Sequence, residues 1–128
     1  MKIFIVSLFA LFAVSAGAQQ NTDPRLKVKF SEERLSELAK NHPSVIEYWT
    51  FYLDNAYVVS TVEPGKNVQD LQTISIDDPN DFNILALDIH PVENASGYYL
   101  IEGTDKMLIV HSSEKIAELF NAHRQSNQ

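Results

Sequence analysis

Three side chains with metal-binding chemistry stand at the ends of two expected strands. Asp88 and His90 are two residues apart in one such segment, so their side chains leave the same face of a strand. His111 ends a different expected strand. Two imidazoles and a carboxylate are ligands that zinc and non-haem iron accept. The three residues are therefore a candidate divalent-metal site, in which a metal-bound water would act as the nucleophile.

A simpler interpretation of the same residues is also open. Ile84 and Ala86 share the expected strand face with Asp88, so a polar strand end that runs into solvent explains the pattern equally well. The spacing of two residues is common in strands of every kind. We therefore expect no metal or other cofactor, and we keep a divalent metal as the alternative. No residue is assigned a catalytic role.

Aromatic residues are the second candidate for a functional surface. Tyrosine rings are apolar across the face and polar at the tip, which suits a groove for a sugar, a peptide or an apolar ligand. The candidate ligand-binding residues are Tyr48, Tyr52, Tyr57, Tyr98 and Tyr99. The same rings would also make a good core, and we expect Trp49 and Phe51 to belong to the core.

Two further patterns are explained by local structure. Residues 77–81 offer carboxylate and amide oxygens to calcium, but they lack the glycine and the distal glutamate of an EF-hand loop. Asp and Asn around a proline are also what a turn requires, and a turn is expected. His111 and Ser112 are neighbours, whose side chains point to opposite faces of a strand. Without a G-x-S-x-G elbow, a serine hydrolase is not expected.

The composition excludes several classes of function. The chain has no cysteine, which excludes disulfides, thiolate zinc sites, iron–sulfur clusters and thiol nucleophiles. Its 17 acidic and 10 basic residues give a net charge of −7, and the acids are dispersed along the sequence. A chain this acidic is repelled by phosphate backbones and by anionic lipid surfaces. We therefore expect no nucleic-acid partner and no binding to a membrane surface.

The N-terminus has the three parts of a cleavable secretory signal. Lys2 precedes an apolar run over residues 3–14, and small residues follow at positions 16–18. The run is shorter than the roughly 20 apolar residues that a bilayer span needs. We expect residues 1–18 to be a signal peptide and the mature protein to be secreted or periplasmic, without membrane insertion after cleavage.

The remaining sequence divides into a domain and two flexible ends. Residues 19–27 are polar and contain a proline, so we expect a flexible mature N-terminus with order beginning near Val28. Residues 28–124 are expected to form a single domain. Residues 125–128 are expected to be a frayed tail.

Serine residues mark the starts of the expected helices. Ser31 precedes two glutamates and is expected to cap a helix that ends by Asn41. Ser44 and Glu47 match a capping box, which predicts a second helix through Asp54. A serine at position 112 or 113 is expected to cap a final helix with apolar residues at helical spacing up to position 123.

Between the helices, short β-branched and aromatic runs alternate with turn formers, which indicates strands. We expect five strands, at residues 57–62, 71–76, 82–90, 98–102 and 106–111. Gly103 starts a three-residue connection between the last two, which predicts a hairpin. The expected fold is α+β, with two N-terminal helices, a sheet of about five mostly antiparallel strands and a C-terminal helix packed on the same face.

The function expected from these features is that of a small, exported, non-enzymatic domain that acts by binding a protein or a small ligand. One alternative is a metal-dependent, hydrolase-type enzyme that uses Asp88, His90 and His111. Another is a secreted inhibitor or chaperone-like helper that lends an edge strand to a partner. The last role requires an unpaired and uncharged strand edge, and the order of the strands does not follow from the sequence.

Overall fold

The computed structural model describes residues 22–127, which form three α-helices, two short 3-10 helices and a sheet of four strands. The α+β fold class is confirmed. The expected signal peptide, residues 1–18, lies outside the described residues. No helix within residues 22–127 is long and apolar enough to cross a membrane.

The chain divides into two compact units, Met1–Trp49 and Thr50–Gln128. The described part of the first unit contains the 3-10 helix η1 (Pro24–Val28), the helix α2 (Glu32–Asn41) and the start of α3 (Pro43–Asn55). The boundary between the units therefore falls inside α3.

Part of the segment that we expected to be flexible, residues 19–27, is helical in the described structure. Helix η1 starts at Pro24 rather than near Val28, and Leu26 within it is fully buried. The Asp23 carboxylate caps this helix by accepting a hydrogen bond from the backbone N–H of Arg25 at 2.9 Å. It also accepts one from the Arg25 guanidinium at 2.8 Å. This hydrogen bond lowers the pKa of Asp23.

The predicted cap of α2 is confirmed, and the predicted start of α3 is shifted. The Ser31 hydroxyl accepts the backbone N–H of Arg34 at 3.1 Å, and α2 ends at Asn41 as expected. Helix α3 begins at Pro43, so Ser44 lies inside its first turn instead of before it. Proline fits this position because the first helical N–H has no partner within the helix.

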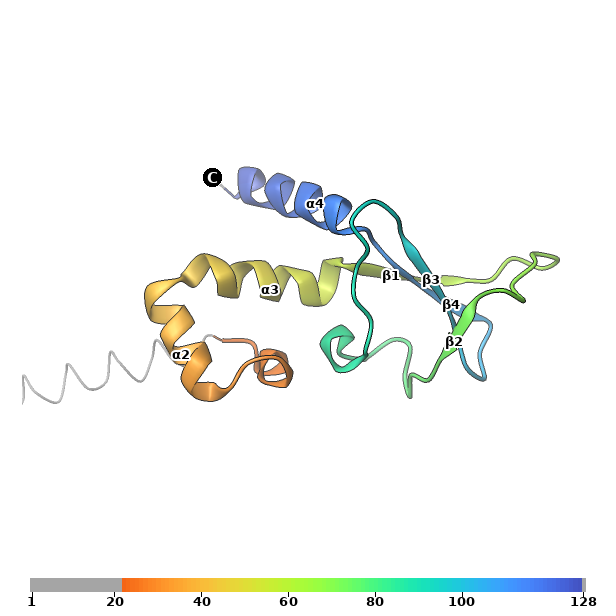
Figure 1. The fold of residues 1–128 in the computed structure, drawn as a ribbon, viewed down its shortest axis with the longest axis horizontal. Helices are drawn as coiled ribbons and strands as arrows, with labels where there is room; N and C mark the ends of the chain where they lie inside the picture. Colours follow the sequence, from red (N-terminus) through yellow and green to blue (C-terminus); the bar gives the residue numbers. More distant parts are fainter. Residues whose placement is uncertain (1–21, 128) are drawn as a thin grey trace, which may run out of the picture. The chain divides into compact units, whose positions relative to one another are not determined.

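The sheet has four strands in the order β1-β4-β3-β2 (Figure 1). They are β1 (Tyr57–Thr61), β2 (Gln72–Ile74), β3 (Gly97–Ile101) and β4 (Lys106–Val110). Strand β4 pairs antiparallel with both β1 and β3, and the predicted hairpin joins β3 to β4. Strand β2 pairs parallel with β3, so the sheet is mixed.

The expectation of a fifth strand at residues 82–90 is wrong. This segment forms the 3-10 helix η2 (Ile84–Ala86), whose N-terminus is capped by Asn83. The Asn83 side chain accepts the N–H of Leu85 at 3.0 Å, and its carbonyl accepts the N–H of Ala86 at 2.9 Å. These local bonds occupy backbone groups that a strand would pair with a neighbour. Without the fifth strand, β2 and β3 are joined by a long connection, as parallel pairing requires.

The two faces of the sheet differ in burial. Leu108 is 0 % exposed, and Val110 and Ile101 are each 2 % exposed, on what we call the closed face. Side chains alternate between the two faces along each strand, and the pairing register aligns this alternation across the sheet. The strand residues that do not share a face with Leu108 form what we call the open face. The open face consists of Val58, Ser60, Thr73, Tyr98, Leu100, Met107 and Ile109. Val58 remains 46 % exposed and Tyr98 48 %.

The chain ends in α4 (Ser113–Ser126), which extends beyond the predicted end at residue 123. The Ser112 hydroxyl accepts the N–H of Lys115 at 3.1 Å, so the predicted serine cap is confirmed. Phe120 of α4 lies 5.4 Å from Phe51 of α3, measured between ring centroids. The expected packing of all helices on one face of the sheet stays a prediction.

The cap of α2 predicts a change in stability. Ser31→Ala removes the hydroxyl that accepts the Arg34 N–H, so the free energy of unfolding should fall by about 1 kcal/mol. Ser36→Ala is the matched control, because Ser36 is exposed within the same helix, where alanine is the better helix former. Urea unfolding followed by circular dichroism measures both. A Ser31→Ala variant as stable as Ser36→Ala would contradict the role of the cap.

The Asp23 cap predicts a dependence on pH. Its pKa is lowered from 3.8 in the folded state, so its ionised form stabilises the fold above pH 3.8. This stabilisation is lost as the pH falls through the lowered folded-state pKa. At pH 7, Asp23→Ala should cost about 1 kcal/mol, and the difference from wild type should shrink below pH 3.8. Thermal unfolding across pH tests this, with the exposed Asp70→Ala as control; a difference that does not change with pH would argue against it.

Candidate functional site

The residues proposed as metal ligands do not come together. Asp88 and His90 lie outside the strands and are exposed, with 3.5 Å between His90 Nε2 and Asp88 Oδ1. His111 follows β4, where its backbone N–H donates to the Ala56 carbonyl. Within residues 22–127, no three His, Asp or Glu side chains are grouped so that they could hold a metal ion. The structure thus offers an exposed contact between one imidazole and one carboxylate in place of the proposed three-ligand set.

Three of the candidate tyrosines are divided between the two faces of the sheet. Tyr98 and Tyr99 are adjacent in β3, so their side chains point in opposite directions. Tyr98 belongs to the open face, whereas Tyr99 lies on the closed face with Tyr57. The Tyr57 ring is 4.9 Å from the Phe82 ring, measured between centroids.

The other two tyrosines lie in α3. Tyr48 packs edge to face on Trp49 at 5.2 Å between ring centroids, and burial raises the pKa of Tyr48. Lys29 Nζ lies 4.3 Å from the centroid of the Trp49 ring, within range of a cation–π interaction. Tyr52 is buried and offers little surface to a ligand, whereas Trp49 and Phe51, which were expected in the core, are half-buried.

Strand β1 is an outer strand of the sheet, paired on one side only. Val62 donates its N–H to the Asp105 carbonyl, and His111 donates its N–H to the Ala56 carbonyl. In an antiparallel pair such bonds recur at every second residue, so Val58 and Ser60 direct their backbone groups toward β4. The N–H and C=O groups of Val59 and Thr61 consequently face the outer edge.

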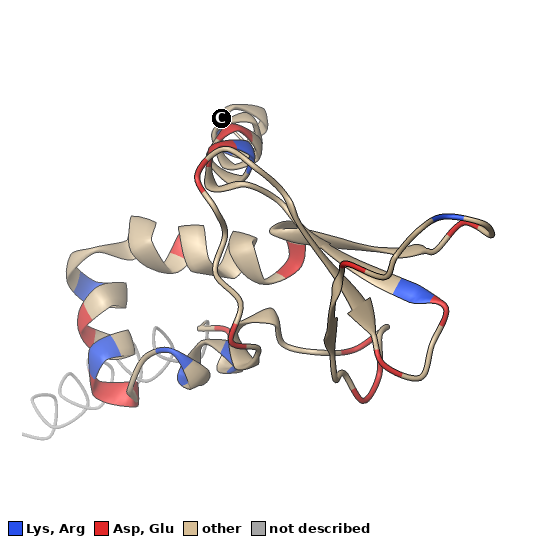
Figure 2. Cartoon of the chain, turned by 45° about the vertical axis from the view of Figure 1, so that its right-hand side comes forward, with Lys and Arg blue, Asp and Glu red and all other residues tan. Residues whose placement is uncertain are grey.

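The outer edge at β1 carries no charged side chain. Among the strand residues of the described sheet, only Lys106 is charged, as the colouring in Figure 2 shows. The opposite edge, β2, is only three residues long and has Asp70 and Asp77 close by in sequence. Short edges with nearby charges resist pairing with other chains. Strand β1 is longer, at five residues, but Asp54 and Glu63 flank it in sequence and Lys106 Nζ donates to Thr61 Oγ1 at 2.8 Å. Its length and the uncharged side chains of its own residues are therefore what distinguish it from β2.

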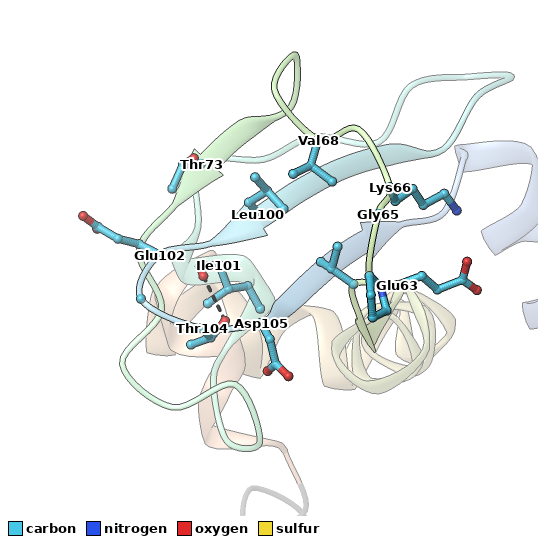
Figure 3. A pocket seen from close by; sticks show the side chains of 13 residues that line it. Glu63, Gly65, Lys66, Val68, Thr73, Leu100, Ile101, Glu102, Thr104 and Asp105 are labelled. Carbon is cyan, nitrogen blue, oxygen red and sulfur yellow. Dashed lines mark hydrogen bonds between the residues drawn. The ribbon is translucent and has the colours of Figure 1, made fainter.

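A shallow hollow of about 540 Å³ opens beside the β3–β4 hairpin, and Figure 3 shows it from close by. Val68, from the loop after β1, and Leu100 of β3 face each other across it. Val62 also contributes to its apolar lining. Because Leu100 belongs to the open face as well, the hollow continues that apolar surface. Together, the edge of β1, the open face and the hollow are the candidate binding surface of the second unit.

Most residues of this surface were not singled out from the sequence. Tyr98 was predicted as a ligand-binding residue, whereas Val59, Val62 and Leu100 were not predicted to have any role in binding. One signal was present, because residues 107–110 are all apolar, a pattern typical of a strand with apolar side chains on both faces. If one face of such a strand is buried in the core, its apolar side chains on the other side form a second apolar face of the sheet.

Comparison with known proteins identifies no relative. No protein family, curated protein or solved structure matches this chain.

Because Asp88, His90 and His111 do not form a three-ligand group within residues 22–127, we expect no strong metal binding by this set. We expect the metal-stripped protein to keep its unfolding midpoint when zinc, manganese or calcium is added. A ligand at a hundred times its dissociation constant would stabilise the fold by about 2.7 kcal/mol, or roughly 10 °C for a domain near this size. Calorimetry measures the shift. A rise of that size that His90→Ala abolishes would restore the metal site.

Proposed function

We propose that this chain is a small, exported, non-enzymatic domain that binds another protein by adding an extended segment of it to the edge of β1. The observation that carries the proposal is the uncharged outer strand β1. Localisation outside the cytoplasm rests on the signal-like sequence at residues 1–18. An inhibitor or a chaperone-like helper would use such an edge.

The backbone geometry of β1 suits strand addition. The outward N–H and C=O groups of Val59 and Thr61 supply the alternating donors and acceptors that an added strand requires. Such main-chain bonds give affinity without demanding one particular sequence. The strand residues are β-branched or aromatic except Ser60, a composition that favours pairing.

The open face adds an apolar surface next to this edge. Val58 lies at the edge and is 46 % exposed, and Ile109 is its partner on the neighbouring strand β4. An added strand would place every second side chain on this side of the sheet, next to Val58. Alternating apolar side chains in the partner would therefore be preferred.

The net charge of −7 is consistent with a protein partner. A phosphate backbone would be repelled by the acidic chain, whereas a neutral peptide backbone would not. The metal-dependent alternative receives no support, because its three proposed ligands are not grouped within residues 22–127.

The proposal predicts that Val59→Pro blocks binding. The Val59 N–H faces outward, so proline removes a donor to the partner while it leaves the bonds to β4 in place. The probe is a ten-residue peptide of alternating threonine and valine, followed by NMR of the labelled protein. We expect wild type to show shifts in the β1 amides, and Val59→Pro to bind at least about tenfold more weakly, since it loses a hydrogen bond and close approach.

Two controls make this test specific. Val59→Ile keeps the N–H and a β-branched side chain, so it should bind as wild type does. The same peptide with a central proline cannot complete a strand and should not bind. Circular dichroism and the β4 amide signals establish that Val59→Pro is folded. Equal binding by the folded Val59→Pro variant, or no binding by wild type, would refute strand addition at β1.

A further inference from the structure

The hollow beside the β3–β4 hairpin has an apolar lining that is half-exposed. Val62, Val68 and Leu100 line it and are each partly open to solvent. Figure 3 shows the side chains of Val68 and Leu100 directed toward one another across it. An aliphatic chain placed between them would remove apolar surface from water, which is favourable.

The walls of the hollow are held by hydrogen bonds. Thr104 Oγ1 donates to the Ile101 carbonyl at 2.9 Å and accepts the N–H of Lys106 at 3.0 Å. The Glu102 N–H donates to the Ile74 carbonyl of β2, which ties the turn to the neighbouring strand. The turn that carries Glu102 is therefore fixed in place before any ligand arrives.

The charges around the hollow are unbalanced. Its lining includes three carboxylates, of Glu63, Glu102 and Asp105, and one ammonium group, of Lys66. In Figure 3, the side chains of Glu63 and Lys66 extend toward the same side, away from Glu102.

Two carboxylates of the lining, those of Glu63 and Glu102, form no ion pair with another residue of 22–127. Asp105 has a cation nearby, because Lys106 Nζ is 3.8 Å from its carboxylate. Lys66, which supplies the ammonium group of the lining, extends on the side of Glu63 and away from Glu102 (Figure 3). Of these two carboxylates, Glu102 is therefore the one without an ammonium group of the lining on its own side, and it lies in the hairpin two residues after Leu100.

We propose that this hollow binds a lysine or arginine side chain of a partner protein, with the aliphatic stem between Val68 and Leu100 and the cationic head beside Glu102. Long basic side chains combine an apolar stem with a charged end, which matches an apolar floor with an acidic rim. A carboxylate side chain would be repelled at the same position. The hollow begins at Val62, just beyond the end of β1, and the binding of a basic side chain in it does not require strand addition along β1.

The test uses three five-residue peptides with blocked ends, identical except at the central residue. The central residue is lysine, glutamine or glutamate, and two leucines stand on each side of it. NMR titration of the labelled protein up to about 5 mM peptide reports both the affinity and the residues affected. Glu102→Gln is the variant, and Glu93→Gln, at an exposed loop position outside the hollow lining, is the matched control.

We expect the lysine peptide to shift the amide signals of residues 62–68 and 100–105, and to bind about two- to fivefold more tightly than the glutamate peptide, as an exposed ion pair allows. Glu102→Gln should remove this preference without changing affinity for the glutamine peptide, and Glu93→Gln should not affect it. The preference should also weaken near about 0.5 M salt.

Three results would overturn the proposal: equal affinity for the lysine and glutamate peptides, signal shifts that lie outside the hollow, or no binding by any peptide. None of them bears on the β1 edge, which the alternating peptide and Val59→Pro test separately. A preference for lysine that survives Glu102→Gln would also count against the assigned position of the cation.

Discussion

Antiparallel pairing of β4 on both sides is the interaction on which the second unit depends. Strand β4 joins β1 to β3, and its residues Leu108 and Val110 are almost completely buried on the closed face. Because β4 uses the backbone groups on one side of β1, only the other side of β1 can face outward. The same pairing forms the hairpin whose turn carries Glu102. Both proposed binding positions are therefore consequences of where β4 lies.

Local signals in the sequence predicted much of the secondary structure. Ser31 and Ser112 cap helices because a serine hydroxyl satisfies a backbone donor within three residues, and this chemistry is independent of the rest of the fold. The segment at residues 82–90 was misassigned because its apolar residues suit either a strand or a buried turn of helix. The hydrogen bond from the Leu85 N–H to the Asn83 side chain caps a helix and therefore favours the helical alternative. The parallel pairing of β2 followed from that change and involves residues far apart in sequence, which local patterns do not reveal.

The binding surface was harder to predict than the fold. Alternation places Tyr98 and Tyr99 on opposite faces once both are assigned to one strand, so the proposed tyrosine groove was already divided by the expected strand. An edge, however, is defined by the absence of a neighbouring strand. The sequence of β1 shows that it is uncharged, but only the strand order of the sheet shows that it is outermost. The importance of Glu102 likewise depends on which side chains surround it in space.

The uncharged edge of β1 also bears on colloidal behaviour. An edge that accepts one foreign segment could, by the same hydrogen bonds, accept the β1 edge of another copy and start an aggregate. The charge of −7 acts against this, because every copy repels every other at distances of about a Debye length, whereas neutral or basic segments approach freely. In the proposed function, the two tasks would therefore fall to different parts of the molecule: the backbone edge of β1 would attract a partner strand, and the dispersed acidic charge would oppose association between copies.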